Sequence, residues 1–197
     1  GWNTLMTGEL YGTSFWGALF RTLLVTVVSL VLLIFLSILT GYGLAGLNRR
    51  YQMAVYNIYL LQMVIPAMLI LLPQYLLIQW VYNLIPGYAD EGLVRTALQL
   101  FSIVLINIKG TALSVMIFTA AIGAIPKEIE DSAMIDGASS WQYIRHILLP
   151  LLKVPIVSLI VIMLPLIYNQ FLEPYVYLDP KNSTLLPFTQ SAVGQFS

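Results

Sequence analysis

The feature that most constrains this chain is a long run without charge. From Thr22 to Leu47 there are 26 consecutive residues with no Asp, Glu, Lys or Arg. A helix of roughly 20 apolar residues is enough to cross the hydrocarbon of a bilayer. The whole chain agrees, with 59% hydrophobic and 9% charged residues, where a soluble domain usually carries about 25% charged residues. The sequence therefore predicts an all-α integral membrane protein.

The positions of the charges predict about four membrane spans. The expected spans cover residues of about 18–40, 53–73, 96–122 and 154–172. A shorter apolar piece, 74–84, follows the second span, and Pro66 and Pro73 are expected to kink or end helices in this region. Residues 1–14 and 174–197 are rich in polar, Gly, Tyr and Pro residues and are predicted as loops.

One long polar segment, 126–150, interrupts the apolar sequence. It holds four of the nine acids and is predicted as two short helices joined by a tight turn. Pro126 suits a first helical position, and the acids that follow suit a helix N-terminus. Gly137 is the expected stop, and Ser139 with Gln142 has the spacing of a capping box for a second helix.

The second of these helices is expected to carry an apolar face. Its members recur at helical spacing and are Ile144, Ile147, Leu148 and Leu151. Pro150 ends that helix or begins the next segment. His146, beside Arg145, is predicted as a solvated or interface histidine, and the adjacent Glu130 and Asp131 splay apart on a helix, so neither suggests catalysis.

The same segment resembles the EAA loop of the permease subunits of ABC importers. The residues that carry the likeness are Asp131, Ser132, Ala133, Gly137, Ile147, Leu149 and Pro150. Asp131 and Ser132 depart from the Glu and Ala of the family pattern, while Gly137 and the closing Ile-x-Leu-Pro stand at the family's distances.

Further elements are similar to the sugar-importing branch of that family. Residues 135–138 read Ile-Asp-Gly-Ala, Pro66 and Pro73 lie in Ile-Pro and Pro-x-Tyr elements, and residues 168–174 resemble a Trp-Asn-x-Phe-x-x-Pro element with Tyr in place of Trp. Such permeases usually have six spans. The resemblance therefore implies that this chain is an incomplete or trimmed subunit, without the first and last spans.

The resemblance implies a single transmembrane permease domain over 1–197, with the helical bundle of a type I ABC importer and a cytoplasmic coupling helix in 126–150. It also implies a function, the movement of a sugar or oligosaccharide from a solute-binding protein across a bacterial-type inner membrane. The residues expected to contact the ATPase are Glu128, Asp131, Ser132, Ala133, Asp136, Gly137, Ala138, Ile147, Leu149 and Pro150. The implied partners are a second permease subunit, two ATPase subunits, an extracellular solute-binding protein and the lipid bilayer.

The motifs of common enzymes are missing from the sequence. There is no Gly-x-x-x-x-Gly-Lys-Ser/Thr phosphate loop, so ATP and Mg²⁺ are expected on a separate ATPase chain rather than on this one. There is no cysteine and no His-Glu-x-x-His metal motif, so no metal site is predicted. The formal net charge is zero, which gives no indication of nucleic-acid binding.

The basic residues predict an orientation. Arg49, Arg50, Lys127, Arg145 and Lys153 fall on one side of the membrane in a four-span topology, against Arg21, Arg95 and Lys181 on the other. Basic residues favour the cytoplasmic side, so the segment 126–150 is predicted to be cytoplasmic.

Polar residues at membrane depth are candidates for a substrate pathway. They are Asn57, Gln62, Asn107, Lys109, Tyr168 and Asn169. A charge such as Lys109 in mid-span costs about 3 kcal/mol, so it is expected to line a polar path or to meet an acid of the partner permease. Two alternatives stay open: Lys109 snorkels to an interface, and the uncharged groups only bond between helices.

Two other functions stay open at this point. The first is an importer of another solute, such as a polyamine or an anion, because the loop pattern is common to the whole family. The second is a membrane protein without an ATPase partner. Loss of transport and of stimulated ATP hydrolysis on changing Gly137 would distinguish an importer from the latter.

Overall fold

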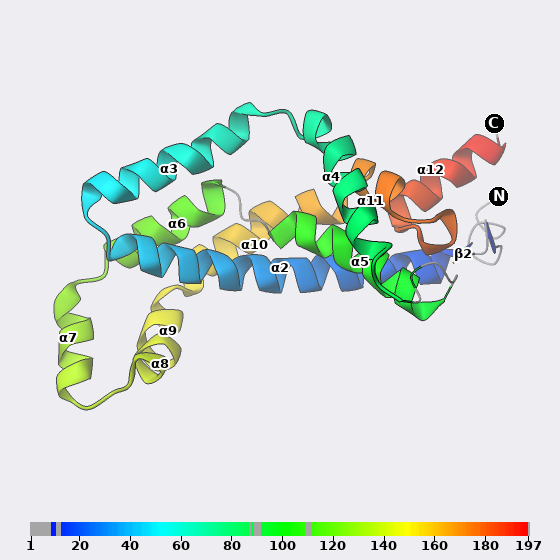
Figure 1. Cartoon of the computed structure of the whole chain (residues 1–197). Coiled ribbons are helices and arrows are strands. Elements are labelled where there is room, and N and C mark those ends of the chain that lie inside the picture. The colour runs from blue at the N-terminus through cyan, green and yellow to red at the C-terminus, as the bar shows by residue number, and fades with distance from the viewer. Residues whose placement is uncertain (1–8, 11–12, 87, 89–91, 109–111, 197) are drawn as a thin grey trace. The chain divides into compact units, whose positions relative to one another are not determined.

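A computed structural model describes residues 9–10, 13–86, 88, 92–108 and 112–196. Most of these residues are helical (Figure 1). The described part has one small strand pair, in which β1 (Glu9–Leu10) runs antiparallel to β2 (Thr13–Ser14). The predicted all-α class is confirmed.

The contacts divide the chain into two compact units. The first unit contains 1–31, 65–109 and 164–197, and the second contains 32–64 and 110–163. The long helix α2 (Phe15–Ala45) begins in the first unit and ends in the second, and α10 (Lys153–Tyr168) runs from the second into the first.

Helix α2 is by itself long and apolar enough to cross a membrane. Three further pairs of helices, each with a short break, pass the same test when the two members of a pair are counted together, so the described residues hold up to four spans. The helices of the first two pairs are α3 (Arg49–Val64), α4 (Ala67–Tyr82), α5 (Leu93–Ile108) and α6 (Ala112–Gly123). The third pair joins Ser140–Leu151 to α10.

The two prolines of the second predicted span behave differently. Pro66 separates α3 from α4, as expected, but Pro73 lies inside α4. The predicted end of the span at about residue 73 is therefore wrong, since the break lies at residues 65–66, whereas the kink expected as the alternative at Pro73 stays a prediction. A proline inside a membrane helix removes one backbone hydrogen bond, a loss that neighbouring groups in membrane proteins often compensate.

The prediction of a loop over 174–197 is also wrong. This stretch contains the end of α11 (Leu172–Tyr177), a 3₁₀ turn (Pro180–Asn182) and α12 (Leu185–Phe196). Tyr177 and Phe188 from this stretch are almost fully buried. Its Tyr and Pro content suggested a loop, but burial of the aromatic side chains in the first unit stabilises helical structure there.

In the second unit, α2 and α6 approach each other very closely. A Cβ atom built on Gly41 would lie 2.8 Å from the Cβ of Phe118 and 3.0 Å from the backbone nitrogen of Thr119. Four residues earlier on α2, the hydroxyl of Ser37 donates a hydrogen bond of 3.0 Å to the hydroxyl of Ser114. Small residues four apart thus let the two backbones meet, as is common between membrane helices.

Candidate functional site

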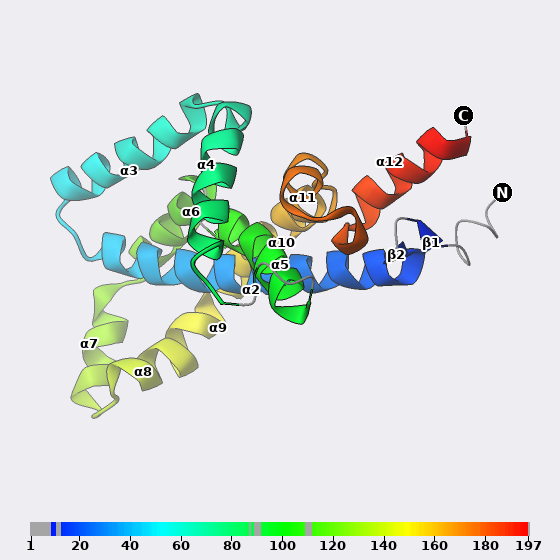
Figure 2. The same cartoon turned by 45° about the vertical axis from the view of Figure 1, so that its right-hand side comes forward.

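Two short helices and a tight turn form the predicted polar segment, and Figure 2 shows them as a hairpin. Helix α7 (Lys127–Ile135) is capped by Asp136, and Gly137 follows with a φ of 83°. The nitrogen of Gly137 bonds to the carbonyl of Met134, and that of Ala138 to the carbonyl of Ala133. This paired pattern satisfies the last carbonyls of α7 and requires the left-handed conformation that glycine adopts easily. The prediction of a glycine stop is confirmed.

The start of the second helix, α8 (Ser140–Tyr143), also agrees with its prediction. The Ser139 hydroxyl accepts from the nitrogen of Gln142 at 3.3 Å, and the Gln142 side chain accepts from the nitrogen of Ser139 at 2.7 Å. This is the predicted capping box. Pro126 differs slightly, because it precedes α7 as its cap with a ψ of 133° instead of occupying the first helical position.

The predicted apolar face of the second helix is only partly correct. A π-turn occupies Ile144–Leu148, followed by α9 (Leu149–Leu151). The residues buried along this segment are Tyr143, Leu148 and Leu152, whereas Leu151 is 50% exposed. A π-turn adds a residue to one helical turn, so the buried face moves by one position after it.

The predicted ATPase-contact residues differ in exposure. Most of them lie on the surface of the hairpin, namely Glu128, Asp131, Ser132, Asp136, Gly137 and Pro150. Ala138, Ile147 and Leu149 are half-buried, and Ala133 is buried inside the hairpin. A shallow hollow of about 320 Å³ lies beside the turn, lined by Asp136, Gly137, Ala138, Gln142, His146 and Ile147.

Sequence reasoning missed two exposed apolar side chains of the hairpin. Ile135, at the end of α7, is 85% exposed, and Trp141 of α8 is 63% exposed. Both are large apolar residues close to the turn of the one long polar segment. That position in the sequence is the signal that could have identified them. A contiguous exposed apolar patch marks a protein-binding surface, and these two side chains supply exposed apolar area on either side of the turn.

A larger hollow, of about 520 Å³, lies between α7 and the helix ends of the second unit. It is lined by Tyr42, Gly43, Ala45, Gly46, Leu47, Ile122, Gly123, Ile125, Pro126, Lys127, Glu130, Asp131 and Tyr143. The hydroxyl of Tyr42, on α2, donates a hydrogen bond of 2.7 Å to Oε1 of Glu130, on α7. Glu130 is half-buried and Asp131 is exposed, so the two adjacent acids point to different surroundings.

The structure brings one predicted pathway residue, Asn107, against Gln170. Their amides exchange two hydrogen bonds, and Asn107 also donates to the hydroxyl of Ser29 at 3.3 Å. Tyr168 is half-buried and borders a small cavity of about 10 Å³ in the same unit. Asn169 is exposed and donates to the carbonyl of Pro165 on its own helix.

The other predicted pathway residues are not brought to this cluster. Asn57 is exposed and Gln62 is half-buried, both on α3 in the second unit. Neither makes a side-chain hydrogen bond within the ranges that the structure describes. Lys109 and its neighbour Thr111 lie outside the described residues.

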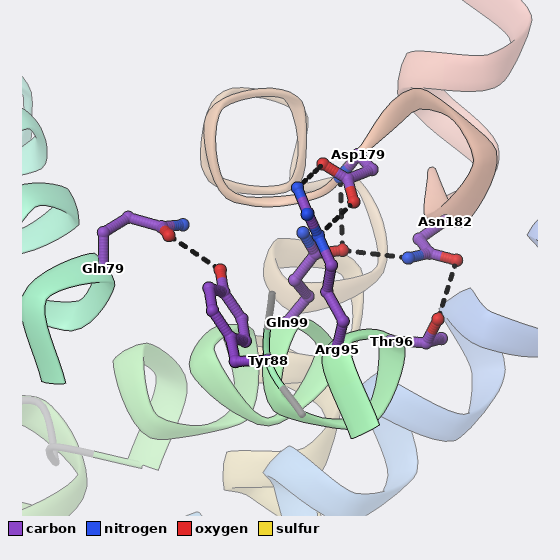
Figure 3. A network of polar contacts seen from close by, with 7 residues as sticks. All are labelled: Gln79, Tyr88, Arg95, Thr96, Gln99, Asp179 and Asn182. Carbon is purple, nitrogen blue, oxygen red and sulfur yellow. Dashed lines mark hydrogen bonds and ion pairs between the residues drawn. The ribbon is translucent and has the colours of Figure 1, made fainter. Parts of the chain in front are cut away.

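A polar network in the first unit was not predicted as a site (Figure 3). Arg95 on α5 contacts both carboxylate oxygens of Asp179, at 2.8 and 3.0 Å. The side-chain oxygen of Gln99, one turn further on, accepts from the amide of Asn182 at 2.9 Å. The side-chain oxygen of Asn182 accepts from the hydroxyl of Thr96 at 3.3 Å. Gln99 and Asn182 are buried, so the network holds the 3₁₀ turn firmly on α5.

Tyr177 supports the same unit from α11. Its hydroxyl donates a hydrogen bond of 3.1 Å to the carbonyl of Leu71, on α4, and its ring meets the Tyr75 ring edge-on at 5.5 Å. Burial, together with the nearby carboxylate of Glu173, raises the pKa of Tyr177 to about 12. The phenol therefore stays protonated, and remains a donor, to a higher pH than a free tyrosine does.

The basic residues from which the membrane orientation was predicted divide into two groups, one in each compact unit. The five basic residues expected on the cytoplasmic side all belong to the second unit, and all are exposed. The three expected on the opposite side belong to the first unit. Within the described ranges, no three His, Asp or Glu side chains gather in a way that could hold a metal ion.

The chain is similar to known transport proteins. The family model described as "Binding-protein-dependent transport system inner membrane component" matches residues 33–191. A probable permease protein for starch degradation products, AmyC of Thermoanaerobacterium thermosulfurigenes, is 27% identical over 85% of this chain and 56% of its own length. A lactose permease protein, LacG of Rhizobium radiobacter, is 25% identical over 86% and 57%.

A third relative has a different named solute. The sn-glycerol-3-phosphate transport system permease protein UgpE of Rhizobium meliloti is 26% identical over 84% of this chain and 54% of its own length. The chain thus spans little more than half the length of these curated relatives.

Proposed function

Because this chain belongs to the family of binding-protein-dependent transport system inner membrane components, we propose that it forms the core of the transmembrane subunit of an ATP-driven importer of a sugar or oligosaccharide. The names of AmyC and LacG, with starch degradation products and lactose as solutes, support the sugar class. The helical spans and the polar hairpin support the role of a permease.

The proposed complex contains several further chains. A second permease subunit would complete the path, two ATPase subunits would bind ATP with Mg²⁺, and an extracellular solute-binding protein would deliver the sugar. The chain would cross a bacterial-type inner membrane several times. The grouping of the five exposed basic residues in the second unit supports a cytoplasmic hairpin.

The single observation that carries the coupling role is the surface of the hairpin. Ile135 and Trp141 expose apolar area next to the acids Asp131 and Asp136. Burial of an exposed Ile or Trp in a groove of a partner would supply most of the binding energy. Acids at the rim would pair with basic residues of the partner and contribute little each. This arrangement suits docking onto an ATPase.

The test uses the chain assembled with its ATPase and solute-binding partners in liposomes. Ile135→Ser removes apolar area from an exposed side chain, so the fold should remain while sugar-stimulated ATP hydrolysis and uptake fall. Leu93→Ser, at a side chain 89% exposed on the first unit, is the matched control and should retain both activities. Wild-type stimulation in the Ile135 variant would overturn the coupling role.

The turn itself offers a second test. Gly137→Leu forces a bulky residue into a φ of 83° and onto the surface beside the hollow, so stimulated ATP hydrolysis should be lost. Gly137→Asn is the control, because Asn tolerates the left-handed conformation and adds less bulk. Retained stimulation in the Leu variant would contradict the proposal.

The proposed substrate path uses the polar residues at membrane depth, namely Asn57, Gln62, Asn107, Lys109, Tyr168 and Asn169. Amide and hydroxyl groups suit the hydroxyls of a sugar. Lys109→Met removes a charge and keeps an unbranched side chain. Uptake should fall or change its solute preference while the complex still assembles; loss of assembly would indicate instead that Lys109 pairs with an acid of the partner permease.

An importer of an organic anion is the second candidate. Lys109, a cation that the sequence predicts within a span, would favour a negatively charged solute, and the name of UgpE includes sn-glycerol-3-phosphate. Competition decides between the two classes. Inhibition of uptake by unlabelled maltose or lactose, but not by sn-glycerol-3-phosphate, is expected for the sugar class, and the opposite pattern would establish the anion class.

A further inference from the structure

Part of the polar hairpin, the side of α7 with Lys127, Glu130 and Asp131, lines a hollow beside the ends of α2 and α6. The hollow of about 520 Å³ described above separates α7 from these helix ends. A close-packed interface transmits displacement through steric contact, but atoms on opposite walls of a hollow do not push on each other. Across this hollow, a displacement of α7 reaches α2 only through contacts that span it.

The Tyr42–Glu130 hydrogen bond is such a spanning contact. The donor belongs to α2, the acceptor belongs to α7, and the distance of 2.7 Å is typical of a hydroxyl bound to a carboxylate. Glu128 and Asp131 of the same helix are exposed, whereas Glu130 is half-buried. Glu130 is thus distinguished from its neighbours by pointing toward the helix end.

Tyr42 lies where α2 is firmly attached to α6. It directly follows Gly41, the position at which the two backbones meet so closely that no Cβ fits without a shift. The Ser37–Ser114 hydrogen bond ties the same two helices one turn away. A force applied at Tyr42 would consequently move α2 and α6 together in this unit.

We propose that Tyr42 and Glu130 are positioning residues that pass movement of the hairpin to α2. This inference rests on the proposed function, because it concerns how ATP hydrolysis is coupled to transport. The residues that contact the ATPase receive the movement, and the Tyr42–Glu130 bond transmits it. Glu130 is not one of the residues that the family resemblance led us to expect at the ATPase contact, although Glu128 and Asp131 are.

Two variants change the bond in different ways. Tyr42→Phe deletes the donor hydroxyl and so removes the bond, whereas Glu130→Gln keeps a neutral acceptor of the same shape and so weakens it. Tyr51→Phe, at an exposed tyrosine of α3 in the same unit, is the matched control for loss of a hydroxyl. The full complex with its ATPase and solute-binding partners is reconstituted in liposomes, with maltose as the probe sugar if the wild type accepts it.

The measured quantity is the number of sugars transported per ATP hydrolysed, together with the ratio of stimulated to basal hydrolysis. Tyr42→Phe should lower transport per ATP by about 5-fold or more, the smallest effect usual for a coupling interaction. Glu130→Gln should give a smaller loss, because its amide oxygen still accepts the bond, and the double variant should be no worse than Tyr42→Phe, because both changes act on one bond. Tyr51→Phe should match the wild type.

The outcomes separate the inference from the proposed function. Unchanged transport per ATP in Tyr42→Phe would overturn the inference, even if thermal unfolding shows a loss of stability, because that result would mean a structural role alone. Additive losses in the double variant would also overturn it, since the residues would then act independently. A wild-type complex that neither transports a sugar nor stimulates hydrolysis would refute the proposed function instead.

Discussion

Asn107 and Gln170 face each other and exchange two hydrogen bonds, of 3.1 Å and 2.7 Å between their amide groups. The pair joins α5 to the segment that follows α10, within the first unit. The sequence left two roles open for Asn107, a substrate path and a bond between helices. The structure shows the bond between the two amides, and a role of Asn107 in the substrate path stays a proposal.

The first prediction concerns this pair. Asn107→Leu should lower the free energy of unfolding by about 1 kcal/mol, because the amide of Gln170 loses its partner in a partly buried place. Thermal unfolding of the detergent-solubilised chain measures the effect. Asn169→Ala, at an exposed amide that bonds only to its own helix, should change stability little. Unchanged stability with lost uptake in the Leu variant would assign Asn107 to the path.

A second prediction concerns the ion pair of the network. Arg95→Lys keeps the charge but loses the two-pronged contact with Asp179, whose side chain is only 26% exposed. The unfolding free energy should fall by about 1 kcal/mol, and the loss should persist at high salt because partly buried pairs are weakly screened. Arg50→Lys, at an exposed position, is the control. Equal stability of the two variants would contradict a supporting role of the network.

The third prediction compares two glycines of α2. Gly41→Ala introduces a Cβ that would lie 2.8 Å from the Cβ of Phe118, so α2 and α6 must separate and stability should fall by about 1–3 kcal/mol. Gly43→Ala introduces a Cβ that meets nothing within 4 Å, and should stabilise the helix by up to about 1 kcal/mol. Opposite shifts of the unfolding temperature are expected. A stabilised Gly41→Ala variant would refute the close crossing.

The fourth prediction concerns orientation. A single cysteine at Ser140 should be inaccessible to a membrane-impermeant thiol reagent in intact cells and become labelled after permeabilisation. Ser140 is exposed, and unlike Ser139 it does not cap the helix with its side chain, so the substitution preserves the capping box. The chain has no other cysteine to react. Labelling from outside intact cells would reverse the predicted topology.

Several elements were predicted correctly because their sequence signals extend over only a few residues. The turn at Gly137 depends on one glycine conformation, and the start of α8 depends on two side chains three residues apart. The end of a span at residue 73 and the loop over 174–197 were wrongly predicted, because the signals used for them were local as well. Proline and turn-rich composition are local statistics, and burial against distant segments overrides them.

The π-turn at Ile144–Leu148 shows the same limit on a smaller scale. The helical spacing of apolar residues was a correct signal for a helix, but one wider turn moved the buried face by a position. Ser37 and Gly41 carried a usable signal, since small residues four apart favour close helix packing. Their partners on α6 could not be identified from that pattern.

Apolar length and the positions of the charges were sufficient for the membrane class and the approximate spans, because hydrocarbon tolerates charge poorly wherever the chain is placed in it. Glycine and capping residues predicted the polar hairpin. The contacts that distinguish one polar residue from another required the tertiary structure. Glu130 meets Tyr42 across 88 residues of sequence, Asp179 meets Arg95 across 84, and Gln170 meets Asn107 across 63. Such partners are selected by how the helices pack, since each polar group in a poorly hydrated interior is stabilised by whichever donor or acceptor the fold brings within reach.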